Sequence, residues 1–139
     1  MVKGEKSIVE TGKRKDAIAR ASVYPGTGKI TINSIPLELW GNELSRMRIR
    51  EPLALSEDLA NKVDINVSVR SGGTTGQTDS IRMVIARCLV KFSKSNELRQ
   101  KFINYDRNLL VFDFRRNEPH HGHGASKRGS RRHKQRSKR

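Results

Sequence analysis

The most regular alternation of apolar and polar side chains in this chain runs from residue 63 to residue 70. The apolar positions in that segment are Val63, Ile65, Val67 and Val69, and the residues between them are polar. Successive side chains of a β-strand point to opposite faces, so this period is typical of a strand with one buried face. The segment is therefore the clearest predicted strand and suggests a small sheet.

Three further strands are predicted in the first third of the chain, over 7–10, 18–24 and 29–33. A basic turn at 12–16 separates the first two, and a Pro-Gly-Thr-Gly sequence separates the second from the third. Proline and glycine favour tight turns, and the third segment alternates polar and apolar residues. The residues 18–33 are accordingly predicted to form a β-hairpin.

Apolar residues recur at helical spacing after the strand 63–70, and one face carries Ile81, Ile85, Cys88, Leu89 and Phe92. This spacing predicts a helix that begins at Thr75 or Thr78 and ends at Phe92. Thr74 and Gln77 have the spacing of a capping box, which would satisfy backbone groups at the start of this helix.

Shorter helical segments are predicted elsewhere. The residues 36–38 favour a single turn, Asn42 is a suitable N-cap for a helix over 43–50, and Pro52 is expected to break or kink the chain after that helix. Another short helix is predicted over 96–102. This order of strands and helices predicts an α+β domain with the helices on one face of a small sheet.

Charge divides the chain into two parts. Of the 29 Lys and Arg, eight lie in 119–139, which contains no Asp or Glu, so this segment contributes eight of the 15 net positive charges. Such a composition buries too little apolar surface to fold alone, whereas 1–118 is long enough for one domain. We therefore expect a globular domain over 1–118 and an extended basic tail over 119–139. A polyanion, most commonly nucleic acid, is the expected partner, and a merely solubilising surface is the alternative.

Other features narrow the class of protein. There is no apolar run near the ~20 residues of a membrane span, and 1–12 lacks an apolar signal region. The single cysteine, Cys88, fits a reducing compartment and is expected to be buried, so a cytoplasmic location is predicted. Histidine occurs only in the tail, which disfavours a His-based active site. The cluster His120, His121 and His123 lacks the further ligands of a zinc site, so neither a metal nor a cofactor is predicted.

A glycine-rich loop at 71–77 leads from a predicted strand into a helix. Its backbone N–H groups and the helix start could hold an RNA phosphate, and the alternative is a tight turn that needs positive φ. The loop does not end in Gly-Lys-Ser/Thr, so it is no Walker motif. The adjacent cations Lys13, Arg14 and Lys15 are either a solvated charge run or a second RNA contact.

Four ordered motifs together resemble a known family. They are 12–20 (GKRKDAIAR), the glycine- and isoleucine-containing segment 26–37, the loop and helix 69–87, and the terminal 135–139 (QRSKR). Together they resemble ribosomal protein S nine of the small subunit. The segment 105–116 resembles the archaeal and eukaryotic branch, and the short N-terminus favours an archaeal member.

The resemblance implies an α+β fold like ribosomal protein S five domain two, with a left-handed crossover. It implies a non-enzymatic place in the head of the small ribosomal subunit, beside neighbouring head proteins and away from any membrane. The implied rRNA-binding residues are Lys13, Arg14, Lys15, Arg20, Gly72, Gly73, Gly76, Gln77, Arg82, Arg115, Arg116, Lys127, Arg128, Arg131 and Arg132. The tail is expected to reach the peptidyl-site tRNA through Ser137, Lys138 and Arg139.

Two other classes of function remain open at this point. One is a free-standing nucleic-acid-binding regulator, which would act outside a large particle. The other is a small-molecule phosphotransferase, because a kinase superfamily shares the implied fold. That activity would need a fuller glycine-rich loop, a general base and a second domain, none of which the sequence contains.

Overall fold

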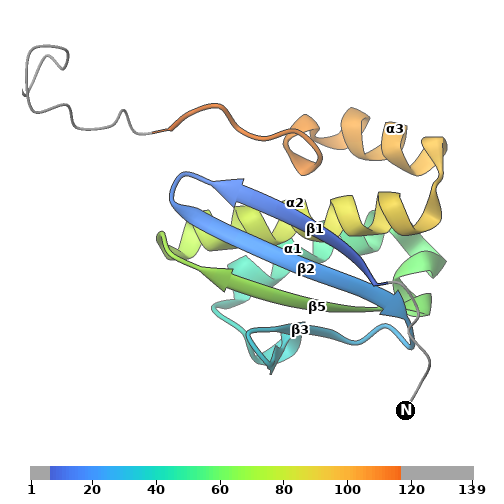
Figure 1. Ribbon diagram of the computed structural model, residues 1–139, viewed down its shortest axis with the longest axis horizontal. Coiled ribbons are helices and arrows are strands. Elements are labelled where there is room, and N and C mark those ends of the chain that lie inside the picture. The colour runs from blue at the N-terminus through green and yellow to red at the C-terminus, as the bar shows by residue number, and fades with distance from the viewer. Residues whose placement is uncertain (1–6, 117–139) are drawn as a thin grey trace, which may run out of the picture.

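The computed structural model describes residues 7–116, which form one sheet with helices on one side of it (Figure 1). The strands are β1 (Ile8–Arg14), β2 (Ala17–Pro25), β3 (Ile30–Ile32), β4 (Ile35–Pro36) and β5 (Val63–Arg70). The α-helices are α1 (Glu43–Ser56), α2 (Thr74–Ser93) and α3 (Asn96–Tyr105), and the short 3-10 helices are η1 (Leu37–Leu39), η2 (Glu57–Lys62) and η3 (Arg107–Leu109). The predicted α+β class is confirmed.

The strand β5 lies in the middle of the sheet, whose order is β1-β2-β5-β3-β4. It pairs antiparallel with β2 and parallel with β3. The hairpin predicted over 18–33 is therefore wrong, because β5 separates β2 from β3. The strand β5 buries every second side chain, and a central position with neighbours on both edges removes more of that apolar surface from water than an edge position.

The hairpin at this end of the sheet is instead formed by β1 and β2. Their antiparallel register runs from Ile8 opposite Val23 to Arg14 opposite Ala17, so only Lys15 and Asp16 remain in the turn. The basic turn predicted over 12–16 was therefore too long. Gly12 is a buried strand residue facing α2, and a Cβ atom there would lie 2.4 Å from the carbonyl oxygen of Ser80. Glycine at this position thus allows β1 and α2 to approach closely.

The core lies between the sheet and α2. This helix contacts β1, β2 and β5 on one side and α1 and α3 on the other. The predicted apolar face is confirmed at Ile81, Ile85, Cys88 and Leu89, which are fully buried, while Phe92 is partly buried. Phe102 of α3 is also fully buried and joins the same core. Complete burial of one such side chain contributes about 1.5–3 kcal/mol.

The start of α1 agrees with the sequence, but its end does not. The Asn42 side chain accepts a hydrogen bond from the Ser45 backbone N–H at 2.8 Å, which confirms the predicted N-cap. Pro52 does not end the helix, which continues to Ser56. The buried ring of Pro52 gains apolar contacts that offset the one backbone hydrogen bond it cannot donate. The helix ends where Glu57 takes a positive φ of 52°.

The remaining helical predictions are confirmed. The single turn expected at 36–38 is η1, and the helix expected over 96–102 is α3, which extends three residues further to Tyr105. Among the described residues, no helix combines the length and the apolar character needed to cross a membrane.

Candidate nucleic-acid interface

Of the glycine-rich segment 71–77, only Ser71, Gly72 and Gly73 form the loop between β5 and α2, and all three are exposed, while 74–77 form the first turn of α2. Ser71 and Gly72 have positive φ angles of 63° and 72°, whereas Gly73 is the N-cap of α2 and has a φ of −98°. In the described part of the chain no side chain caps the first turn of α2, so the backbone N–H groups of that turn face the loop without a side-chain acceptor there. A helix start of this kind favours the binding of a phosphate group.

The capping box predicted at Thr74 and Gln77 is wrong. Gly73 takes the extended N-cap conformation, which makes Thr74 the first helical residue. The Gln77 side chain instead donates from Nε2 to the carbonyl oxygen of Ser71 at 3.1 Å. Gln77 therefore holds the loop in shape and does not cap the helix.

The three loop glycines differ in the space around them. A Cβ atom on Gly72 would lie 2.8 Å from the backbone nitrogen of Ala17, and one on Gly76 would lie 3.4 Å from the carbonyl oxygen of Arg14. Glycine at position 72 therefore lets the loop pack against the turn between β1 and β2, whereas the distance at Gly76 is close to an ordinary contact. A Cβ atom on Gly73 would meet no atom within 4 Å. Packing within the described chain thus requires glycine at position 72 and leaves open space at Gly73.

The cations of the β1–β2 hairpin are divided between two sides of the sheet. Strand alternation directs Lys13 to the uncovered face and Arg14 to the helices, while Lys15 lies exposed in the turn with a φ of 52°. Within residues 7–116, neither lysine has an ion-pair partner, whereas Arg14 pairs with Asp79 and Asp113. Lys13 and Lys15 are therefore free for a polyanion, and Arg14 contributes to the internal structure.

The uncovered face of the sheet carries two arginines near the same end. Arg20 is exposed on β2 opposite Ser68 of β5, and Arg70 is exposed at the end of β5 opposite Ile18. In the part of the chain that the structure describes, neither side chain has a hydrogen-bond or ion-pair partner. Arg70 was not among the RNA-binding residues predicted from the sequence. Its position at the polar phase of the strand, directly before the glycine-rich loop, was the signal that would have identified it.

Arg82 lies within an internal cluster of charges. Its guanidinium pairs with Glu51 of α1 and, at 2.7 Å, with Asp106, and only 11% of its side chain is exposed. Burial acts to lower the pKa of Arg82, but the hydrogen bonds and charges of Asp106 and Glu51 raise it above its ordinary value. This geometry gives Arg82 a structural role that ties α2 to two other elements.

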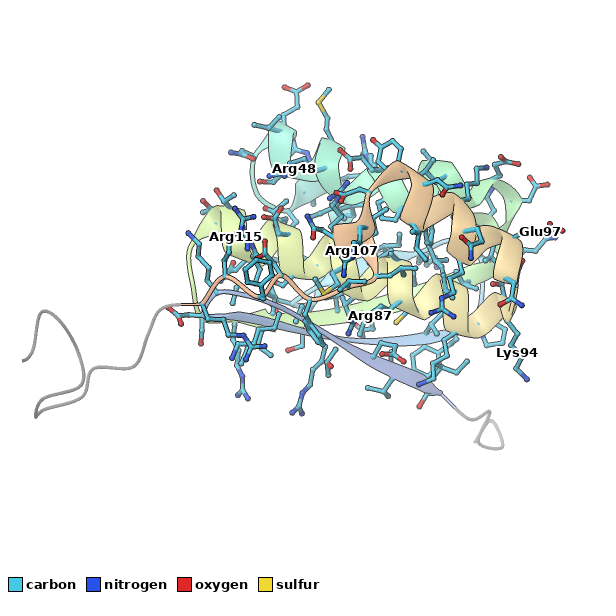
Figure 2. All side chains as sticks on the ribbon, turned by 90° about the horizontal axis from the view of Figure 1, so that it is seen from above. Arg48, Arg87, Lys94, Glu97, Arg107 and Arg115 are labelled. Atoms are coloured by element: carbon cyan, nitrogen blue, oxygen red, sulfur yellow. The ribbon has the colours of Figure 1, made fainter. Side chains whose placement is uncertain are left out.

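A second internal arginine, Arg87, fastens the segment that follows α3. It donates two hydrogen bonds to the carbonyl oxygen of Leu110, at 2.7 and 3.0 Å, and one to that of Thr11 in β1, at 2.9 Å. Its guanidinium also lies 4.0 Å from the centre of the Phe112 ring. Figure 2 shows Arg87 between α2 and this segment. These contacts hold the segment against α2 and β1.

Asp113 fastens the same segment nearer the tail. It accepts hydrogen bonds from the Arg115 backbone at 2.9 Å and side chain at 2.7 Å, and it pairs with Arg14. The bonds from Arg115 hold the pKa of Asp113 well below its usual range. Arg115 is exposed but bound to Asp113, and Arg116 is exposed beyond this anchor. The chain therefore leaves the described region at the end of the sheet that also carries Arg14 and the β1–β2 turn (Figure 1).

Comparison with known proteins supports the resemblance seen in the motifs. The family model described as ribosomal protein S9/S16 matches residues 12–139. The chain belongs to this family. Small ribosomal subunit protein uS9 of Thermoplasma volcanium is 48% identical over 130 residues, which are 94% of this chain and 96% of that protein. Proteins of the same name from Desulfurococcus amylolyticus and Pyrobaculum aerophilum are 47% and 45% identical, over 82% and 87% of this chain and 81% and 87% of their own.

These relatives confirm the predicted archaeal type of this S9-family chain. Several predicted contacts lie outside the described residues, namely Lys127, Arg128, Arg131, Arg132, Ser137, Lys138 and Arg139. Between residues 7 and 116, no group of three His, Cys, Asp or Glu side chains is placed to hold a metal ion. Cys88 is buried as predicted, and burial raises its pKa to about 12.

Proposed function

We propose that this S9-family protein is a structural RNA-binding constituent of the head of the small ribosomal subunit. The observation that carries the proposal is a group of cations beside the exposed glycine-rich loop, Lys13, Lys15 and Arg70, whose side chains have no ion-pair partner within residues 7–116. These residues lie on a chain with a net charge of +15. A concentrated positive field favours rapid, salt-sensitive binding to RNA phosphates.

The proposal extends to the organisation of the protein. The strands β3 and β5 are parallel, and α1 and η2 lie between them in the chain, so the connection must cross over the sheet. We propose that this crossover is left-handed, as in the fold of ribosomal protein S five domain two. We propose a division into a globular domain over 1–118 and a basic tail over 119–139. Small-subunit rRNA and neighbouring head proteins are the proposed partners, in a ribosome-bound, cytoplasmic and non-enzymatic role.

We expect the affinity for small-subunit rRNA to fall steeply with salt concentration. The logarithm of the affinity should fall with the logarithm of salt by about 0.7 for each neutralised phosphate of unpaired RNA. Filter binding of the full-length protein over a series of salt concentrations measures this slope. A nearly flat response would mean that apolar or base-specific contacts dominate, contrary to the proposal.

Sedimentation separates the ribosomal role from that of a free-standing regulator. A ribosomal constituent should remain with small subunits after a high-salt wash, in about one copy for each subunit. A regulator should dissociate and sediment with its own smaller target. Migration away from the subunits would favour the regulator.

We also propose that the tail reaches the peptidyl-site tRNA through Ser137, Lys138 and Arg139. An arginine guanidinium holds a phosphate with two parallel hydrogen bonds, which a lysine cannot reproduce. Loss of one charge-assisted contact costs roughly 1–3 kcal/mol. Deletion of Lys138 and Arg139 should therefore leave subunit assembly intact but weaken tRNA binding to that site or increase frameshifting.

The measurement uses purified subunits that carry the shortened protein. Its incorporation is confirmed first by mass spectrometry of the washed subunits. Binding of tRNA and the frequency of frameshifting are then compared with those of wild-type subunits. Normal incorporation together with wild-type values of both quantities would contradict the role proposed for the tail end.

A further inference from the structure

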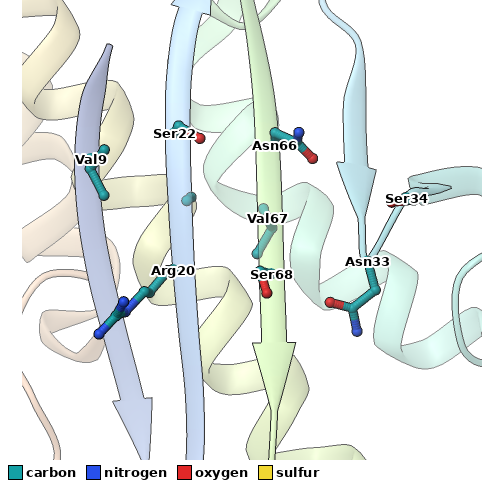
Figure 3. Close-up of a pocket in the computed structure, with 9 residues that line it drawn as sticks. Val9, Arg20, Ser22, Asn33, Ser34, Asn66, Val67 and Ser68 are labelled. Atoms are coloured by element: carbon teal, nitrogen blue, oxygen red, sulfur yellow. The ribbon is translucent and has the colours of Figure 1, made fainter.

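A hollow of about 310 Å³ lies on the face of the sheet that the helices leave uncovered (Figure 3). It crosses β1, β2, β5 and the turn between β3 and β4. Its lining residues are Val9, Arg20, Ala21, Ser22, Asn33, Ser34, Asn66, Val67 and Ser68. The set contains one cation, five hydroxyl or amide side chains and no carboxylate. Ser68 in this lining lies two residues before Arg70 on β5, a spacing of roughly 7 Å in a strand.

The polar groups of the hollow are mostly free to bind a ligand. The Asn66 side-chain oxygen accepts a hydrogen bond from the Thr31 hydroxyl at 2.7 Å, which leaves the Asn66 amide N–H groups available. Within residues 7–116, the side chains of Arg20, Ser22 and Ser68 form no hydrogen bond or ion pair. The arginines that face the helices behave differently, since Arg14, Arg82 and Arg87 all bind acceptors of the protein itself.

The rim of the hollow is held in place by the turn between β3 and β4. Asn33 and Ser34 both have positive φ angles, 50° and 67°. The Asn33 side chain accepts a hydrogen bond from the Val69 backbone N–H at 2.9 Å and donates one to the Val69 carbonyl oxygen at 3.0 Å. These two bonds tie the turn to β5, so the hollow is formed before any ligand arrives.

We propose that this hollow binds a phosphate and ribose of the rRNA backbone, as a second contact beside the glycine-rich loop. The Arg20 guanidinium is suited to a phosphate, while the serine hydroxyls and the Asn66 amide are suited to a ribose 2′-hydroxyl, which both donates and accepts. The absence of a carboxylate from the lining favours an anionic ligand. The inference rests on the proposed RNA-binding function and adds Ser22, Asn66 and Ser68 to the residues expected to contact rRNA.

Tethered cleavage tests where the RNA lies. Ser68→Cys places a thiol in the hollow, and Asn104→Cys places one on the exposed surface of α3 as a matched control. The native Cys88 is buried and its pKa is raised to about 12, so a thiol-reactive iron chelate should attach only to the introduced cysteine. In assembled small subunits, hydroxyl radicals generated at position 68 should cut a short, defined stretch of rRNA.

Position 104 should leave that stretch uncut. Equal cleavage from both positions, or cleavage of a neighbouring protein rather than rRNA from position 68, would overturn the proposal. If wild-type protein binds rRNA with the expected salt dependence but position 68 produces no cut, the hollow is not an RNA site and the proposed function stands. If wild-type protein does not bind rRNA, both fail.

A charge substitution provides an independent measurement. Asn66→Asp keeps the size of the side chain and its acceptor for the Thr31 hydroxyl, so the fold should be retained, and Asn104→Asp adds the same charge on α3. We expect Asn66→Asp to lower rRNA affinity about tenfold, because the amide hydrogen bond to the ribose is lost and the new negative charge repels the neighbouring phosphate. Asn104→Asp should lower it less than about twofold, as a distant exposed charge is screened by salt. Equal losses in the two variants would contradict the hollow as a binding site.

Discussion

Replacing Gly73 by serine should weaken rRNA binding about tenfold or more while slightly stabilising the fold. Gly73 is the N-cap of α2, has a φ of −98°, and has open space where a Cβ atom would lie. Serine is a better N-cap than glycine by a few tenths of a kcal/mol, because its hydroxyl accepts a backbone N–H of the first turn. The same hydroxyl would occupy the N–H groups that we propose for an RNA phosphate, and its Cβ atom would hold the backbone away.

Gly72→Ala is the matched comparison, and its expected effect is on folding. Gly72 has a φ of 72°, and its Cβ atom would lie 2.8 Å from both the backbone nitrogen and the Cβ atom of Ala17. A left-handed conformation costs a residue other than glycine roughly 1–2 kcal/mol, and the close contacts add about 1 kcal/mol or more. Urea unfolding should therefore show a loss of at least about 2 kcal/mol in Gly72→Ala and none in Gly73→Ser.

The two readouts separate the two interpretations of the loop. Free energies of unfolding come from urea titration. The rRNA affinities come from filter binding at one salt concentration, under conditions in which both variants are folded. An unchanged rRNA affinity in Gly73→Ser would mean that the loop is a plain turn, because Gly73, which packing does not require, would then have no role in binding.

Replacing Arg82 by methionine should destabilise the domain by about 2–4 kcal/mol. Arg82 pairs with both Glu51 and Asp106, and its side chain is only 11% exposed. Its removal would leave two carboxylates close together without a cation, and breaking a buried ion pair from one side costs about 3–5 kcal/mol. The carboxylate side chains are 30% exposed, so solvent screening lowers the expected loss below that of a fully buried pair.

Arg50→Met on the exposed surface of α1 is the control for this substitution, because it also removes one positive charge. Its free energy of unfolding should stay within about 0.5 kcal/mol of wild type. When measured on folded protein, rRNA binding by Arg82→Met should match that of Arg50→Met. Unchanged stability with a selective loss of rRNA affinity in Arg82→Met would instead support the direct RNA contact implied by the family resemblance.

Local patterns in the sequence were sufficient for much of the secondary structure. The alternation over 63–70 predicts the bounds of β5. Helical spacing places the start of α2 one to four residues late and its end one residue early. The cap at Asn42 was equally evident, because its partner Ser45 is three residues away. Each of these features depends on residues close together in the chain, which a sequence pattern contains directly.

The candidate interface was less predictable, because availability to a ligand depends on distant partners. Lys13, Arg14 and Lys15 are adjacent cations of similar appearance, but only Arg14 faces the helices and pairs with Asp79 and Asp113. Arg70 was overlooked because its place on the polar face of the strand, directly before the loop, does not by itself show whether its side chain has a partner. Of the two adjacent glycines, Gly72 has a positive φ angle and Gly73 does not. The loop packs against Ala17 at Gly72, so a side chain would clash at Gly72 but not at Gly73.

The sequence by itself determined the family, the separation of charge between 1–118 and 119–139, and most helices and strands, because composition, motifs and periodicity are properties of the chain alone. Only the tertiary structure decided that β5 lies between β2 and β3, and that Arg82 and Arg87 bind the protein's own acceptors while Arg20 has no side-chain partner within residues 7–116. Arg87 and Thr11 are 76 residues apart, and such a contact depends on the packing of the whole domain. Strand order and the pairing of charges arise from long-range contacts, in which the burial of β5 and α2 outweighs the preference of neighbouring segments to pair.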